Sequence, residues 1–161
     1  MKNSNFLNEL KEKRNLELIE ISEEISKSYL IKSEKCKAAA KAVFDAGIYE
    51  NAISEAYYSI YNVVTALFYK CGIKCENHSA AVILLKILFN QDKLHEIFLA
   101  FKKDRIDNQY YMPFSNSEPI SKEQCSEKLK IAQNFCIELK TYMKSLTNED
   151  ITNIRNNFNN I

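Results

Sequence analysis

The segment Glu50–Lys70, ENAISEAYYSIYNVVTALFYK, decides the fold of this chain. It contains neither glycine nor proline, and its apolar residues recur at the spacing of an α-helix rather than at the alternating spacing of a strand. These residues cover more than half of the helix circumference: Ile53, Ala56, Tyr57, Ile60, Tyr61, Val63, Val64, Leu67 and Phe68. A helix with so wide an apolar surface is packed by neighbours on several sides, so we predict that this one is central.

The same segment carries one narrow polar stripe. At about 100° per residue, six side chains fall close to a single line along the helix: Asn51, Glu55, Tyr58, Asn62, Thr65 and Tyr69. A polar line on an otherwise buried helix meets solvent, lines a cleft or faces a partner chain. We expect this stripe to border a cleft or a dimer interface.

Composition favours a single all-helical domain. The chain has 161 residues, which is enough for one domain with a substantial core. Its 2 glycines and 2 prolines argue against a sheet protein rich in tight turns, so we predict an all-α, up-and-down bundle of four to five helices. The formal net charge of +1 gives no global signature of a duplex nucleic-acid binder or of a membrane-surface protein.

The cysteines and the apolar runs indicate a cytoplasmic protein. The chain has 5 cysteines and 2 histidines, and only Cys71 and Cys75 form a close pair, so we expect free thiols and no metal site. No apolar run approaches the roughly 18 residues that would cross a bilayer, and the N-terminus lacks a hydrophobic signal core. The sequence contains no glycine-rich phosphate loop and no dinucleotide fingerprint, and we expect no cofactor.

Local signals divide the chain into helices. We expect a short N-terminal helix, a helix from about residue 16 that stops at Gly47, and the central helix as its antiparallel neighbour. A loop over 73–77 leads to a short apolar helix over 80–89, for which Asn77 or Ser79 is the cap.

The second half of the chain is divided in the same way. A further helix begins near Asp92 and ends near Tyr111, ahead of Pro113, and the last long helix begins at Ser121. We therefore predict one helical domain over 1–146, with its core over about 27–145 and an N-terminal helical extension. Residues 147–161 are Asn-rich with sparse apolar anchors, and we predict a flexible tail there.

One short segment gathers most of the candidate chemistry. Residues 102–111, KKDRIDNQYY, combine three cations, two carboxylates, two amides and two phenols at the end of a predicted helix. A surface helix end held by ion pairs is one interpretation, and an anion-binding site is the other. His78, ahead of an apolar helix, is either a capping or packing residue or an accessory site residue. The tyrosines of the central helix are either core residues or a ligand platform.

The order of these features resembles that of the HEPN family. Residues 40–68, AKAVFDAGIYENAISEAYYSIYNVVTALF, are similar to the first two helices of that domain, with its G-x-Y-x-x-A turn and its A-Y-Y-x-x-Y segment. A G-I-x(4)-H segment and an R-x(4)-Y motif follow, and Ala132 to Phe135 resemble the A-x-x-F stretch of the last helix. The matching residues are Gly47, Tyr49, Ala52, Ala56, Tyr57, Tyr58, Tyr61, Gly72, Ile73, His78, Arg105 and Tyr110.

The resemblance implies a fold, a dimer and a chemistry. HEPN domains are helical bundles that pair symmetrically, and active members bring R-x(4–6)-H residues from two protomers into a cleft that cleaves RNA without metal. The 2′-hydroxyl attacks the neighbouring phosphate, arginine offsets the developing charge, and histidine transfers protons. Here Arg105 occupies the arginine position, but Tyr110 stands in place of the histidine. Tyrosine has a reference pKa of about 10, so it is a poor base near pH 7.

Three hypotheses follow. The first is a toxin–antitoxin or defence protein, a homodimer that binds RNA or a nucleotide and is a candidate metal-independent ribonuclease. Its candidate catalytic residues are Arg105 and Tyr110, its phosphate-binding residues are Arg105, Asp107, Asn108 and Tyr111, and its accessory residues are His78 and Tyr58. The second is a non-catalytic module that pairs with a cognate nucleotidyltransferase, which would modify Tyr110 or Tyr111. The third is a purely structural dimeric bundle.

Overall fold

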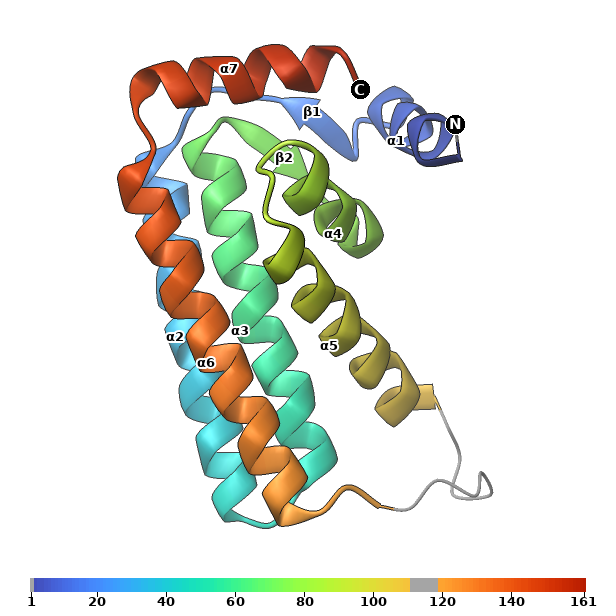
Figure 1. The fold of residues 1–161 in the computed structure, drawn as a ribbon, viewed down its shortest axis with the longest axis vertical. Coiled ribbons are helices and arrows are strands. Elements are labelled where there is room, and N and C mark those ends of the chain that lie inside the picture. The colour runs from blue at the N-terminus through green and yellow to red at the C-terminus, as the bar shows by residue number, and fades with distance from the viewer. Residues whose placement is uncertain (1, 111–118) are drawn as a thin grey trace.

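The computed structural model describes the backbone of residues 2–110 and 119–161, and the side chains of residues 4–107 and 119–161. This part of the chain is mainly helical, with one small antiparallel ribbon (Figure 1). In chain order the elements are α1 (Lys2–Glu12), β1 (Leu16–Leu18), α2 (Glu23–Asp45), α3 (Tyr49–Lys70), β2 (Ile73–Cys75), α4 (His78–Ile87), α5 (Asp92–Tyr110), α6 (Lys122–Ser145) and α7 (Asn148–Asn159). The predicted all-α bundle is confirmed.

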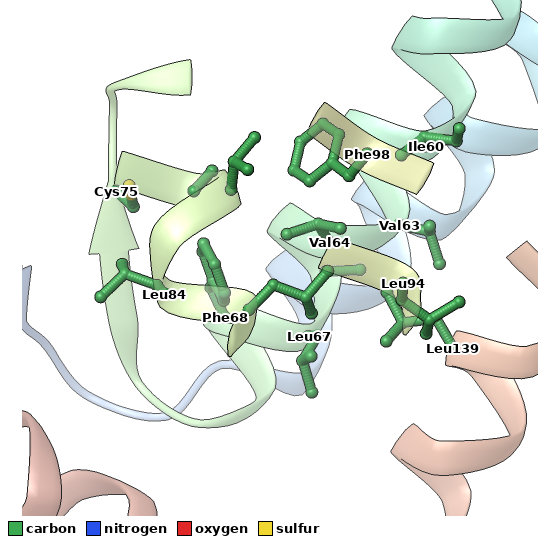
Figure 2. Packing of buried hydrophobic residues seen from close by; sticks show 14 of the residues in the cluster. Ile60, Val63, Val64, Leu67, Phe68, Cys75, Leu84, Leu94, Phe98 and Leu139 are labelled. Carbon is green, nitrogen blue, oxygen red and sulfur yellow. The ribbon is translucent and has the colours of Figure 1, made fainter. Parts of the chain in front are cut away.

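Helix α3 is the centre of the bundle, as its apolar pattern predicts. It packs against α2, α6 and α5 along its length and also contacts α4 and β2 (Figure 1). Its apolar side chains meet residues of the neighbouring elements in one continuous core (Figure 2). The labelled members of that core include Ile60, Val63, Val64, Leu67 and Phe68 of α3 together with Leu84, Leu94, Phe98 and Leu139.

The middle of the polar stripe of α3 is buried, and there Asn62 contacts Cys36 of α2. Asn62 is 9% exposed and Thr65 is 6% exposed. The Asn62 amide donates to the Tyr58 carbonyl at 2.8 Å, and the Thr65 hydroxyl donates to the Tyr61 carbonyl at 2.8 Å. These buried polar groups are therefore satisfied within the helix, as burial requires. The other four residues of the stripe are not buried: Asn51 is exposed, and Glu55, Tyr58 and Tyr69 are partly exposed.

Three predicted boundary signals are confirmed. The Asn77 carboxamide accepts from the backbone N–H groups of Ser79 and Ala80, at 2.9 and 3.0 Å, and so caps α4. Ser121 begins α6 with a reciprocal capping box to Gln124. Gly47 follows α2 with a φ of +78°, the left-handed conformation that glycine adopts without strain.

Two expectations about the N-terminal half are wrong. The helix expected from about residue 16 begins instead at Glu23, after Ser22, whose hydroxyl accepts from the Ile25 N–H. The preceding Leu16–Leu18 pairs antiparallel with Ile73–Cys75, in the segment expected to be a loop. Strands of three residues are too short for period-2 alternation to identify them. The two strands are also far apart in the sequence, so no local pattern indicates that they pair.

The predicted flexible tail is instead helix α7. Thr147 and Asp150 form a capping box at its start. Ile151, Ile154 and Phe158 recur at helical spacing and are buried. The asparagines occupy the exposed face and obscured this pattern. Helices α1 and α7 and strand β1 lie at the same end of the bundle, and we call these three elements the end cap (Figure 1).

All five cysteines are free thiols. Four of them are buried, and Cys36 is partly exposed. Within the described residues, no helix combines the length and the apolar character needed to span a membrane.

Candidate functional site

The candidate site lies where α3, α4 and α5 meet. The first turn of α4 supplies His78 and Ser79, and α3 supplies Tyr57, Tyr58 and Tyr61. Helix α5 supplies Lys102 and Arg105, which are three residues apart and therefore lie on one face of the helix. We call Tyr57, Tyr58, His78, Lys102 and Arg105 the Arg105 cluster.

The imidazole of His78 is held by two tyrosines of α3. Its Nδ1 shares a hydrogen bond with the hydroxyl of Tyr57. Its ring stacks on Tyr61, with the centroids 4.0 Å apart and the planes 8° from parallel. The Tyr57 side chain is fully buried, so it is a rigid support for the histidine. This arrangement fixes both the position and the plane of the imidazole.

The surroundings keep this histidine neutral. Burial lowers the pKa of His78 below its ordinary value, and the nearby cations Arg105 and Lys102 lower it further. Burial also raises the pKa of Tyr57, so its hydroxyl keeps its proton. A neutral imidazole beside a protonated phenol allows two tautomers. When Nδ1–H donates to the tyrosine oxygen, Nε2 is left as a proton acceptor.

Arg105 lies over two aromatic rings. Its guanidinium carbon is 5.4 Å from the centroid of Tyr57 and 5.1 Å from that of Tyr58, which is cation–π geometry. The adjacent Asp104 pairs instead with Lys128, at 2.5 Å. Among the described carboxylates none lies within salt-bridge distance of Arg105. Its N–H groups are therefore well placed to receive an anionic ligand.

Lys102 adds a second cation and connects α5 to α4. Its ammonium group donates to the Ser79 hydroxyl at 2.6 Å. The start of α4, where the positive end of the helix dipole lies, is thus beside both cations of α5. Two of the first N–H groups of α4 are already bound by Asn77. The anion-binding capacity of the site therefore comes mainly from the side chains.

The structure brings together three of the predicted site residues, namely Arg105, His78 and Tyr58. Asp107 is half-buried and has no hydrogen bond or salt bridge to another described residue. Asn108 and Tyr110 lie in the last turn of α5, but their side chains are outside the described residues, as is the whole of Tyr111.

Sequence reasoning did not assign Lys102 or Tyr57 to the site. Lys102 is one helical turn before Arg105, and that spacing was the available signal. Tyr57 reads as a core residue because it lies on the apolar side of α3, and it is indeed buried. Only its hydroxyl, which binds His78, reveals its role in the site.

The comparisons with known proteins identify the family. The family model of the HEPN domain matches residues 26–142, which include most of α2, all of α3 to α5 and most of α6. No curated protein matches the chain. The end cap lies entirely outside the matched region, whereas every residue of the Arg105 cluster lies within it. HEPN domains are associated with RNA, nucleotides or toxin–antitoxin pairs, and this chain belongs to the HEPN family.

Proposed function

We propose that this chain is an RNA-binding protein of the toxin–antitoxin or defence type, with the Arg105 cluster as its phosphate site. The observation that carries the proposal is the convergence of two cations and a neutral imidazole from α5 and α4. Arg105 lies on tyrosine faces and is not paired with a described carboxylate. A guanidinium that is not paired with a carboxylate can bind phosphate oxygens through charge-assisted hydrogen bonds.

The position of His78 favours a second step, cleavage of the bound strand. In this step Nε2 of His78 removes the proton from a ribose 2′-hydroxyl, whose oxygen attacks the adjacent phosphorus. The bond to the 5′ oxygen breaks, giving a 2′,3′-cyclic phosphate and a 5′-hydroxyl that takes its proton from water. Arg105 and Lys102 offset the charge of the pentacoordinate phosphorus. His78 thus supplies the proton acceptor that the R-x(4)-Y motif lacks.

The exposed side of α5 supports the proposal of a homodimer. Leu99 is 45% exposed and Ile106 is 38% exposed, and with Ala100 they line a shallow groove. Ile106 follows Arg105 directly, so a second copy packed against this groove would lie close to the phosphate site. Replacement of Leu99 by Glu should then shift the mass measured by light scattering from dimer to monomer.

Binding to a fluorescein-labelled single-stranded RNA, followed by fluorescence anisotropy, tests the phosphate site. Arg105→Ala should weaken binding about 10- to 100-fold, as expected for a desolvated charge-assisted contact. Lys103→Ala is the matched control, because it removes one charge from an exposed position on the same helix. Equal losses in both variants would contradict a specific role for Arg105. No binding by the wild type would overturn the proposal.

Cleavage is tested separately on the same RNA, in buffer containing EDTA. Wild-type protein should release products that end in a cyclic phosphate, and His78→Gln should retain binding while losing cleavage. Intact RNA after prolonged incubation with wild-type protein would restrict the function to binding.

A further inference from the structure

We infer that a row of tyrosines beside the Arg105 cluster is a base-stacking subsite for unpaired RNA. The row consists of Tyr61 and Tyr69 of α3 and Tyr29 of α2, and we call it the tyrosine track. All three side chains are partly exposed. The inference rests on the proposed function, and it extends the ligand from a single phosphate to a strand of several nucleotides.

The rings of the track lie in parallel pairs. Tyr29 and Tyr69 stack with their centroids 5.4 Å apart and their planes 13° from parallel. Tyr61 stacks on His78, which belongs to the Arg105 cluster. These two stacked pairs are rigid aromatic surfaces of the kind on which successive bases stack in sequence-tolerant single-strand binding.

The track is continuous with the phosphate site. Tyr61 stacks on His78 of the Arg105 cluster, and Tyr69, which carries the other stacked pair, lies on the same helix as Tyr61. Along α3, the eight residues from Tyr61 to Tyr69 span about 12 Å at the helical rise. A strand whose phosphate is bound by Arg105 therefore has aromatic faces beside it for the next few bases.

Cations lie at both ends of this surface. The Lys32 ammonium is 4.6 Å from the centroid of Tyr29, and Lys32 is itself exposed. At the opposite end are Arg105 and Lys102. Lys74, which is also near Tyr69, is paired with both Glu17 and Glu76 and therefore adds no net positive charge. Aromatic faces between unpaired cations match the alternating bases and phosphates of a single strand better than they match a protein surface.

A protein is the competing occupant, because Ile25 is 40% exposed and lies one turn before Tyr29. Two ligands separate the occupants: a labelled RNA dinucleotide, which reaches only the Arg105 cluster, and a labelled RNA octamer, which also covers the track. The test variant is Tyr29→Leu with Tyr69→Leu, and the matched control is Tyr29→Phe with Tyr69→Phe, which keeps both rings.

The Leu variant should weaken binding of the octamer about 10- to 100-fold, since each stacked base contributes about 1–3 kcal/mol. It should leave binding of the dinucleotide unchanged, and the Phe variant should bind both ligands like the wild type. An octamer with abasic sites in the half that covers the track should bind wild-type protein as weakly as the intact octamer binds the Leu variant. This ligand tests the track even if the Leu variant folds poorly.

Each contrary result has its own meaning. If Arg105→Ala weakens both ligands while the Leu variant and the abasic octamer behave like their controls, the phosphate site stands and the tyrosine track is overturned. If the Leu variant changes only the mass measured by light scattering, the surface is a protein interface and the inference is equally overturned. If wild-type protein binds neither ligand, the proposed function fails first.

Discussion

Two arginines in this molecule, Arg155 in the end cap and Arg105 in the candidate site, are in opposite states. Nη1 of Arg155 lies 2.9, 3.0 and 2.9 Å from the carbonyl oxygens of Ile19, Cys71 and Gly72. Arg105 contacts the faces of two tyrosines and has no salt bridge to a described carboxylate. One guanidinium binds three carbonyls in two separate backbone segments, whereas the other retains N–H donors for a ligand.

The different contacts of the two arginines imply different roles: Arg155 stabilises the fold, whereas Arg105 is available to bind a ligand. The carbonyls held by Arg155 belong to the segment after β1 and to the turn between α3 and β2, so this side chain joins α7 to the rest of the fold. Removing it takes that donor away from all three carbonyls, although the Gly72 oxygen still accepts from the Ile19 N–H. Removing Arg105 leaves only aromatic surface. The first change should therefore affect the free energy of unfolding, and the second should affect binding.

The largest effect on stability is expected from Gly72→Ala. A Cβ at this position would lie 1.9 Å from Nη1 of Arg155 and 2.7 Å from the Ile19 oxygen, and the residue has a φ of +67°. The substitution should lower the free energy of unfolding by about 4 kcal/mol, through backbone strain and displacement of Arg155. Urea denaturation followed by circular dichroism measures this loss.

Gly47→Ala is the matched control for that prediction. Gly47 has a φ of +78°, but a Cβ there would meet nothing within 4 Å. Only the backbone strain applies, and the expected loss is about 1 kcal/mol. Equal losses for the two variants would mean that the contact between Gly72 and Arg155 contributes little to the fold.

Arg155→Ala should lower the free energy of unfolding by about 3 kcal/mol, because it removes charge-assisted hydrogen bonds to partly buried carbonyls. Arg155→Lys should recover only part of this loss, since an ammonium lacks the planar fork of the guanidinium. Asn156→Ala, at the neighbouring exposed position, should change stability by less than about 0.5 kcal/mol. A similarly small change for Arg155→Ala would remove the distinction drawn between the two arginines.

Of the two arginines, only Arg105 could be given a role from the sequence alone. Arg105 was assigned to the site because it lies in a recognisable motif near the end of a helix. Arg155 lies in an Asn-rich segment expected to be a tail, although Thr147 and Asp150 have the spacing of a capping box. The apolar spacing of α7 was also present, but three anchors among many asparagines are weak evidence without the surface against which they pack.

The composition of the site was predicted less completely than the fold. The periodicity of α3 is a local property, and it correctly predicted the central helix. The contact of His78 with Tyr57 depends on how the β2–α4 connection folds back along α3, which no local pattern encodes. Lys102 likewise becomes a site residue only because Ser79 lies opposite it. Such contacts between distant segments require the tertiary arrangement.

Arg105→Ala should lower affinity for single-stranded RNA by about 2 kcal/mol while changing the free energy of unfolding by less than about 1 kcal/mol. Its folded-state contacts are cation–π contacts at a half-buried position, which contribute little to stability. Urea denaturation of the same preparation used for the anisotropy measurement gives both quantities. A loss of stability as large as that expected for Arg155→Ala would assign Arg105 a structural role instead.

The smallest effect is a pH dependence that distinguishes the surroundings of the two arginines. The pKa of His78 is lowered in the folded state from its ordinary value of 6.5, first by burial and then by Arg105 and Lys102. Between the lowered value and 6.5 the unfolded chain binds a proton that the folded chain does not. The contribution of His78 to stability is therefore complete above pH 6.5, and it decreases as the pH falls below that value.

Urea denaturation at pH 7.5, 6.5 and 5.5 measures this contribution as the difference between wild-type protein and His78→Gln. Arg105→Gln removes one of the cations that disfavour protonation of His78, so it should reduce the loss of stability on acidification. Arg155→Gln should lower stability at every pH without changing that slope, because Arg155 is not among the groups that shift the pKa of His78. If Arg105→Gln left the slope unchanged and Arg155→Gln altered it, the electrostatic link between Arg105 and His78 would be refuted, and the cleavage step proposed for His78 would lose its support.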